Sequence, residues 1–274
     1  MTINFKVAVI ICVYCNDNIE NFIEAFESIK FEQEGILPSD INMYLHVDGP
    51  IGKRLEEAIH NLDFYKVIYS KENVGLARGL NKLLSSLGNE KYAFRMDADD
   101  ISDPFRLYKQ IKFMETNPQI DFCGGGMAEF IGAKSNVVAT RKYPCDLDKI
   151  NSFMGKASPF SHVTVCFRCA SSAKIGFYPT TYPLNEDIAL WNQAAENNCN
   201  YSNINDIVCF VRMDTAYARR TYIKAKYELE VYLKICKRLN KIPFYPYVRF
   251  FFRLLPPSIV KTVYNSSVRR FLLK

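Results

Sequence analysis

Two features that would place this chain in a special structural class are missing from its sequence. The nine cysteines are scattered over 274 residues, and their odd number does not suit a complete set of disulfides. We therefore expect reduced thiols and neither a disulfide framework nor a zinc site. Internal repeats and low-complexity segments are also not visible.

Long apolar runs are missing as well. No stretch reaches the roughly 20 apolar residues that a membrane-spanning helix needs. Residues 1–15 are apolar, but they carry neither a basic leader nor a small-residue cleavage site. We therefore expect residues 7–13 to form a buried strand and not the core of a signal peptide.

Acidic residues are almost missing from one part of the chain. Residues 217–274 hold fourteen Lys and Arg but only two acids, Glu228 and Glu230, which gives this segment a charge of +12. Since the whole chain carries +6, residues 1–216 carry −6. An acidic body joined to a basic tail indicates a local anionic partner. We predict a catalytic or binding domain over residues 1–216 and a basic, aromatic, helical tail over residues 217–274.

The body has the alternating pattern of an α/β fold. Hydrophobic residues make up 49% of the chain, which is enough for a large core. Strand-like segments at 7–13, 41–47, 67–70 and 92–96 alternate with helix-like segments at 18–30, 55–62, 73–87 and 104–115. Further strands are expected at 122–131 and 163–167, and a helix from residue 186. This order predicts a mostly parallel sheet covered by helices on both faces.

Ligands bind such sheets beyond the carboxyl ends of the strands. Tyr14, Asp48 and Asp97 would all lie on that edge, although they are far apart in sequence. The run Gly124-Gly125-Gly126 leaves two interpretations open: a bulge or close packing, or a close approach of the backbone to a ligand.

An Asp-x-Asp pair follows the fourth predicted strand. Asp97 and Asp99 are two residues apart, so at a strand end their carboxylates can share one divalent cation. Oxygen ligands suit Mg²⁺ or Mn²⁺, which also bind phosphate oxygens. The alternative is an acidic turn, because Asp, Ser and Pro follow at once in residues 99–104.

An ordered set of motifs resembles the family 2 glycosyltransferases, which have the GT-A nucleotide-sugar-binding fold. The similarity is greatest to the branch that builds bacterial capsule, exopolysaccharide and O-antigen repeat units, the amylovoran-biosynthesis type. The motifs are Val9-Ile10-Ile11-Cys12-Val13-Tyr14, Val47-Asp48-Gly49-Pro50, Asn73-Val74-Gly75-Leu76-Ala77, Arg95-Met96-Asp97-Ala98-Asp99-Asp100, Pro104-Phe105-Arg106, Lys109-Gln110, His162-Val163-Thr164-Val165-Cys166-Phe167-Arg168 and Glu186-Asp187-Ile188-Ala189-Leu190-Trp191.

The resemblance implies a site for a UDP-sugar donor and a divalent metal. Asp99 would hold Mn²⁺ or Mg²⁺, and Asp97 would bind the metal or the ribose. Further donor contacts would come from Val13, Tyr14, Asp48, Asn73, Arg78 and Arg95, with Asp48 at the uridine and the two arginines at the phosphates. For each arginine, an ordinary surface or structural ion pair is the alternative.

The resemblance also implies an inverting displacement with a carboxylate base. Asp187 would take the proton of the acceptor hydroxyl, and Glu186 would orient the acceptor. The competing explanation is structural, because Asn185 is a good helix N-cap and acids favour a first helical turn. His162 matches a family histidine that contacts the metal or the diphosphate, and a buried structural histidine is its alternative.

Several positions depart from the family pattern. The usual Pro-Val-Tyr-Asn is Cys12-Val13-Tyr14-Cys15, and one acid of the usual pair before Gly is replaced by His46. Val163 follows the middle histidine in place of Pro, and Gln193 stands where the family has Arg after Leu-Trp. None of these changes removes a proposed catalytic carboxylate.

The basic tail mixes charge with aromatic residues, which suits an anionic membrane surface. The sequence alone also allows a helical hairpin that packs on the body, or a nucleic-acid contact, although no nucleic-acid motif is present.

Together these features predict an inverting, metal-dependent transferase. It would move a hexose or N-acetylhexosamine from a UDP-sugar to a polyprenyl-diphosphate-linked saccharide, in the bacterial cytoplasm at the inner face of the cytoplasmic membrane. Two other functions stay open: a non-catalytic, membrane-associated assembly subunit, and a sugar nucleotidylyltransferase. The second would need a Gly-rich basic loop, which residues 12–18 do not form.

Overall fold

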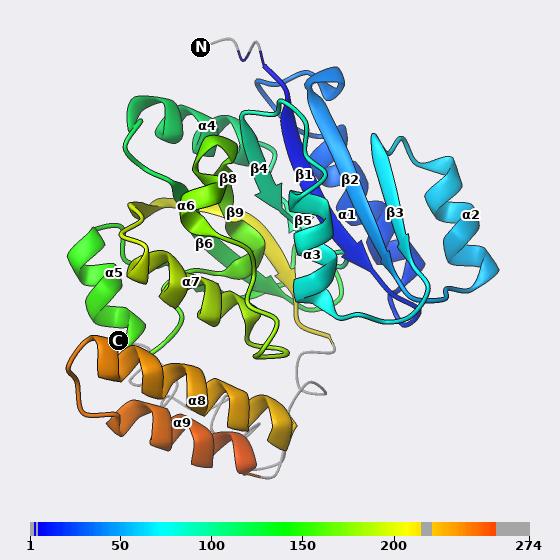
Figure 1. Cartoon of the computed structure of the whole chain (residues 1–274). Coiled ribbons are helices and arrows are strands. Elements are labelled where there is room, and N and C mark those ends of the chain that lie inside the picture. The colour runs from blue at the N-terminus through cyan, green and yellow to red at the C-terminus, as the bar shows by residue number, and fades with distance from the viewer. Residues whose placement is uncertain (1–2, 4, 215–220, 256–274) are drawn as a thin grey trace.

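The computed structural model describes residue 3, residues 5–214 and residues 221–255, and these form one curled sheet with helices on both faces (Figure 1). Within the described chain the sheet has nine strands in the order β3-β2-β1-β4-β8-β6-β9-β5, with β7 paired to β6. The strands are β1 (Val7–Val13), β2 (Ile41–Asp48), β3 (Lys66–Ser70), β4 (Tyr92–Arg95), β5 (Ile101–Ser102), β6 (Phe122–Phe130), β7 (Val137–Arg141), β8 (Cys166–Arg168) and β9 (Tyr201–Arg212).

The helices of the described chain fall into two layers and a C-terminal hairpin (Figure 1). They are α1 (Ile19–Lys30), α2 (Lys53–Asn61), α3 (Leu76–Leu84), α4 (Arg106–Thr116), α5 (Leu147–Met154), α6 (Ser172–Ile175), α7 (Glu186–Glu196), α8 (Tyr222–Arg238) and α9 (Phe244–Leu254). The predicted α/β class, a sheet flanked by helices, is confirmed.

The first half of the sheet is parallel, as the alternating pattern predicted. β1 pairs with β2 and β4, and β2 pairs with β3, all in parallel. Val13 lies opposite Val47, so β1 and β2 end together. The residues that follow the strands, Tyr14 and Asp97, therefore lie with Asp48 along one edge of the sheet, as expected.

Side-chain alternation along β1 divides the core into two clusters. Val7, Val9, Ile11 and Val13 pack with α1 and α4 on one face. Ala8 and Ile10 pack on the other face, in a cluster that includes Leu80 of α3, Trp191 of α7 and Tyr232 of α8. A strand buried on both faces is typical of a central strand in such a sheet.

The second half of the sheet differs from the prediction in detail. Residues 162–164 form a short 3-10 turn, and the strand expected at 163–167 is β8, which begins at Cys166. The strands β5, β7 and β9 were not predicted; β7 is antiparallel to β6, whereas β9 is parallel to β6 and antiparallel to β5. β5 has only two residues, and its partner β9 lies about a hundred residues later, with Ile101 opposite Phe210. Such pairing depends on long-range contacts that local periodicity does not record.

The three consecutive glycines of β6 pack closely against neighbouring strands. The pairing of β6 with β9 shifts register around Gly124 and Gly126, so the run is a bulge. A Cβ on Gly124 would lie 2.3 Å from Oδ1 of Asn203, and one on Gly125 would lie 2.6 Å from the Val208 side chain. Of the two interpretations of this run, the structure supports the bulge and close packing.

All nine cysteines have free thiols, as expected. This includes two pairs with Cys-x-x-Cys spacing, Cys12 with Cys15 and Cys166 with Cys169.

The C-terminal hairpin of α8 and α9 lies below α7 in Figure 1. Val231, Tyr232 and Ile235 of α8 belong to the second core cluster. Buried Glu228 of α8 forms ion pairs with Arg249 and Arg253 of α9, which hold the two helices together. The predicted boundary between residues 216 and 217, and residues 256–274 of the tail, lie outside the described residues. Among the helices that are described, none has the length and apolarity to span a membrane.

The close packing around Gly124 in β6 predicts that a methyl group added there destabilises the protein more than one added at an open glycine. Asn203 cannot move aside easily, because its amide donates to the carbonyls of Pro144 and Pro159. We expect Gly124→Ala to lower the free energy of unfolding by about 2 kcal/mol. Gly52→Ala is the control, since a Cβ there meets nothing within 4 Å. Urea denaturation of both variants measures the difference, and equal stabilities would contradict close packing at Gly124.

Candidate active site

A group of three carboxylates lies directly after β4. Asp97, Asp99 and Asp100 each offer an oxygen, and these oxygens lie within 4.8 Å of one another. Asp97 and Asp99 are partly exposed, whereas Asp100 is buried. Burial, followed by the charges of Asp97 and Asp99, raises the pKa of Asp100 well above its ordinary value. Three crowded carboxylate oxygens fit a Mg²⁺ or Mn²⁺ ion, whose charge would offset their repulsion.

Arg212, at the end of β9, fixes the loop that carries these carboxylates. Its backbone N–H donates to Oδ1 of Asp100 at 2.9 Å, and its Nε donates to the carbonyl of Asp99 at 3.0 Å. The same guanidinium pairs with Glu24 of α1. No local pattern indicates this role, because Arg212 lies more than a hundred residues beyond the loop that it holds.

The guanidinium of Arg95 is the central charge of the site. Arg95 is only 2% exposed, and it forms an ion pair with Asp97. Nε and Nη1 of Arg95 have no hydrogen-bond partner among the residues that the structure describes. Buried N–H groups without a partner cost free energy, so these two donors suit an anionic ligand. The ion pair with Asp97, which was the predicted alternative, therefore uses only part of the hydrogen-bonding capacity of Arg95.

Asp48 at the end of β2 holds the loop before α3. Its carboxylate accepts hydrogen bonds from the N–H groups of Val74 at 2.7 Å and Gly75 at 2.9 Å. Gly49 has φ +89°, and a Cβ there would lie 2.8 Å from the backbone nitrogen of Asn73. The helix expected from residue 73 begins at Leu76, because the preceding N–H groups turn towards Asp48.

The other predicted donor contacts are spread along the same edge. Tyr14 is 40% exposed, and its N–H donates to Asp17. The side chain of Val13 is buried in the first core cluster, so a contact of this side chain with a base is excluded and only its backbone remains available. Asn73 and Arg78 are exposed, and Nη1 of Arg78 lies 3.5 Å from the carbonyl of Val74.

The acidic pair opens α7. The side chain of Asn185 does not cap this helix; its Nδ2 donates to the carbonyl of Lys224 in α8 at 3.1 Å. Asn185 therefore occupies the N-cap position, as the structural alternative expects, but its side chain makes no capping hydrogen bond. Glu186 is 7% exposed, and burial followed by the charge of Asp187 raises its pKa to about 7. Burial also raises the pKa of Asp187. A carboxyl group with a raised pKa suits general base catalysis near neutral pH.

His162 lies in the same buried layer as Arg95 but outside the three-carboxylate group. Its Nε2 is 2.8 Å from the hydroxyl of Tyr178. Burial, followed by the charge of Arg95, lowers the pKa of His162 well below its ordinary value, so the imidazole is neutral. Asn81 of α3 binds both the carbonyl and the N–H of Tyr178, at 2.9 and 2.8 Å. Tyr178 is a site residue that the sequence did not reveal.

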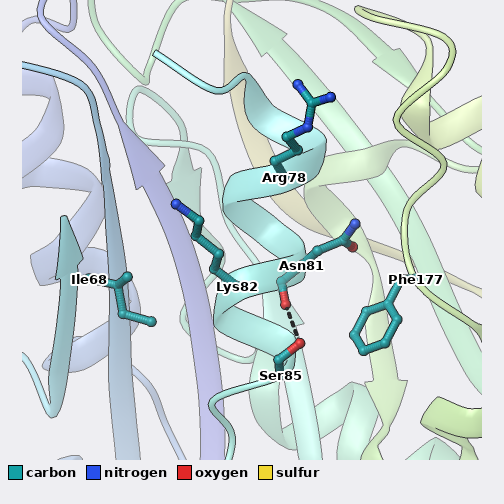
Figure 2. Close-up of a pocket in the computed structure, with 6 residues that line it drawn as sticks. All are labelled: Ile68, Arg78, Asn81, Lys82, Ser85 and Phe177. Carbon is teal, nitrogen blue, oxygen red and sulfur yellow. Dashed lines mark hydrogen bonds between the residues drawn. The ribbon is translucent and has the colours of Figure 1, made fainter. Parts of the chain in front are cut away.

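An open pocket lies beside α3 and is distinct from the carboxylates. Figure 2 shows its lining on α3, β3 and the segment before α7: Ile68, Arg78, Asn81, Lys82, Ser85 and Phe177. Arg78 points away from the other side chains at one end of the pocket (Figure 2). Since no carboxylate lines this pocket, it does not replace the acidic edge as the candidate active site.

Comparison with known proteins identifies the family of this chain. The family model described as glycosyl transferase family 2 matches residues 8–176. The chain is 27% identical to a UDP-Gal:alpha-D-GlcNAc-diphosphoundecaprenol beta-1,3-galactosyltransferase of Escherichia coli, over 97% of this chain and 98% of that protein. It is also 27% identical to the amylovoran biosynthesis glycosyltransferase AmsE of Erwinia amylovora, over 95% and 98% of the two chains.

Among solved structures, the mannosyltransferase PcManGT from Pyrobaculum calidifontis, in complex with GDP-Man and Mn²⁺, superposes with a TM-score of 0.62. The match covers 96% of this chain and 76% of that one at 15% sequence identity, so it establishes the fold alone. The sheet order, the acidic loop after β4 and the family match over more than half of the chain agree with one another. The chain therefore belongs to glycosyl transferase family 2 and has the GT-A fold.

Proposed function

We propose that this protein is an inverting, metal-dependent hexosyltransferase of bacterial surface polysaccharide synthesis, such as O-antigen or capsule synthesis, close to the amylovoran type. It transfers a hexose or N-acetylhexosamine from a UDP-sugar to a polyprenyl-diphosphate-linked saccharide. The observation that carries the proposal is the buried charge of Arg95, which pairs with Asp97 of the three-carboxylate group and also opposes the raised pKa values of Glu186 and Asp187. The E. coli relative supports the choice of donor and acceptor, since its name gives both.

The donor lies along the carboxyl edge of the sheet in this proposal. Asp99 and Asp97 hold Mg²⁺ or Mn²⁺, with Asp100 beside them, and the metal supplies Lewis-acid stabilisation of the departing diphosphate. The unpartnered N–H groups of Arg95 donate to phosphate oxygens. The loop fixed by Asp48, with Asn73, lies beside the uridine, Arg78 contacts the phosphates, and Tyr14 packs on the base. His162 contacts the diphosphate or the metal through the ring nitrogen that Tyr178 does not engage.

The transfer is a single displacement. The acceptor hydroxyl oxygen forms a bond to C1 of the sugar while the bond from C1 to the diphosphate oxygen breaks, and the electron pair of that bond leaves with UDP. The acceptor proton passes to the carboxylate of Asp187. Glu186, which shares the first turn of α7 with Asp187, orients the acceptor. Attack opposite the leaving group inverts the configuration at C1.

The C-terminal hairpin gives the enzyme a surface for an anionic membrane. Large apolar side chains are exposed on α9 and at the start of α8, namely Tyr222, Ile223, Phe244, Tyr245, Tyr247, Val248, Phe251, Leu254 and Leu255. The hairpin also carries the exposed lysines Lys226, Lys234, Lys237 and Lys241. It therefore combines the apolar and cationic features that favour binding to an anionic leaflet. A peripheral location at the inner face of the cytoplasmic membrane follows from this proposal, where a lipid-linked acceptor is within reach.

The metal assignment predicts that UDP binding depends on a divalent cation and on Asp99. Calorimetric titration of UDP should give measurable affinity with Mn²⁺, and a loss of about tenfold or more with EDTA or in Asp99→Ala. Asp63→Ala is the control, because Asp63 is an exposed aspartate before β3 that pairs with Lys30. Metal-independent binding that survives Asp99→Ala would overturn the assignment.

The base assignment predicts that Asp187→Asn binds UDP normally but loses turnover by about 10²–10⁴-fold, the usual contribution of a general base. Turnover is measured as transfer from UDP-sugars to a polyprenyl-diphosphate saccharide. A non-catalytic assembly subunit would instead keep its function in cells after this substitution, as judged by the polysaccharide made. Cells that make normal polysaccharide with Asp187→Asn would therefore exclude the proposed reaction.

The membrane assignment predicts co-sedimentation with vesicles that contain phosphatidylglycerol, and weaker co-sedimentation with pure phosphatidylcholine. Phe244→Ser with Phe251→Ser should weaken binding several-fold, because each removed ring takes apolar area from the interface. Phe105→Ser removes an exposed ring from the body and serves as the control. Equal binding of all three proteins to both kinds of vesicle would argue for a hairpin that only packs on the body.

A further inference from the structure

Helix α8 lies along α7, the helix that opens with the acidic pair (Figure 1). Asn185, next to Glu186, donates its side-chain amide to the carbonyl of Lys224. Further along, Nε of Arg238 donates to Oδ1 of Asn192 at 2.9 Å. These contacts set the first turn of α8 against the first turn of α7. The start of the C-terminal hairpin is therefore built into the edge of the proposed active site.

The acidic pair needs positive charge around it, because both carboxyl groups are largely buried. Two cations act on Glu186 and Asp187: Arg95 from β4 and Lys224 from α8. Arg95 is already paired with Asp97. The other titratable groups that act on the pair or feel its charge are the phenols of Tyr143, Tyr178 and Tyr232.

We propose that α8 is part of the active site and that Lys224 is a positioning residue, which supplies the positive charge facing Glu186 and Asp187. The proposal rests on the assignment of Asp187 as the base. It gives the hairpin a role in the reaction itself, in addition to any contact with a membrane. Since α8 also carries Glu228, the residue that binds α9, the whole hairpin is connected to the acidic pair.

The surroundings of Lys224 are consistent with a charged amine. The pKa of Lys224 is lowered from its ordinary value, by burial first and then by the charge of Arg253, and the charges of Asp187, Glu228 and Glu186 oppose this shift. Glu228, one turn further along α8, pairs with both Arg249 and Arg253. This pairing reduces the repulsion that the two arginines would otherwise exert on Lys224. Three carboxylates thus favour the protonated form of this lysine.

The charge of Lys224 should shift the pH dependence of activity in a defined direction. A cation near a carboxylate favours its ionised form and lowers its pKa, whereas burial raises the pKa of Asp187. A base must be ionised to accept a proton, so activity falls as the pH drops through its pKa. Removal of the Lys224 charge raises this pKa, and the loss of activity then begins at higher pH.

The test is the pH profile of kcat/KM for Lys224→Met, with Lys226→Met as the matched control. Lys226 lies on the same helix but is exposed, and it pairs with Glu230 at 3.9 Å. For Lys224→Met we expect the acid limb to move up by about one pH unit, which is a roughly tenfold lower rate on the falling part of the limb, with little change on the plateau. Lys224→Arg should restore the normal profile, and Lys226→Met should keep it.

Two further measurements keep the result interpretable. UDP affinity and circular dichroism establish that each variant is folded, and if Lys224→Met does not fold, Lys224→Gln is tested for the same shift. An unshifted acid limb in the folded variant would overturn the role of Lys224. If Asp187→Asn abolishes turnover and the Lys224 profile is unchanged, only this inference fails; if Asp187→Asn keeps turnover, the proposed function fails first.

Discussion

The guanidinium of Arg95 lies almost out of water and pairs with Asp97, and the arrangement of the site depends on it. Asp97 lies with Asp99 and Asp100 after β4, and the charge of Arg95 also acts on Glu186 and Asp187 at the start of α7. So many buried or half-buried acids would repel one another strongly without cations. Arg95 offsets part of this negative charge, and the acidic loop after β4 can still bind further positive charge. A divalent ion and the charged donor fit that requirement.

The rest of the fold keeps these charged groups in place. The parallel strands β1, β2 and β4 end at one edge, Arg212 holds the acidic loop from β9, and Asp48 holds the loop before α3. Helix α8 approaches from the opposite direction, through the contact of Asn185 with Lys224. The tail is thus more than an appendage on the surface, because part of it enters the core and part reaches the acidic pair. The donor and the acceptor would react between the carboxyl edge of the sheet and the start of α8.

The first half of the fold could be predicted well from sequence, and the second half only in part: β6, the start of α7 and the helical character of the tail were predicted, but β5, β7 and β9 were not. β1, β2, β3 and β4 are buried parallel strands with regular helices between them, so local periodicity marks each one. β9 and β5 pair over a long separation, and a bulge in β6 breaks the register. Arg212, Tyr178 and Lys224 act through partners far away in the chain, which no local pattern indicates.

The sequence by itself determined the α/β class, the shared edge of Tyr14, Asp48 and Asp97, and the identity of the acidic residues, because these follow from local periodicity and from motifs in order. Only the tertiary structure decided which cations face those acids and how strongly each acid is buried. It joined Asp100 to the carboxylate group, showed that the side chain of Asn185 binds α8 instead of capping α7, and paired Arg95 with Asp97. Burial and charge pairing are properties of chain segments brought together in space, so they appear only once the chain has folded.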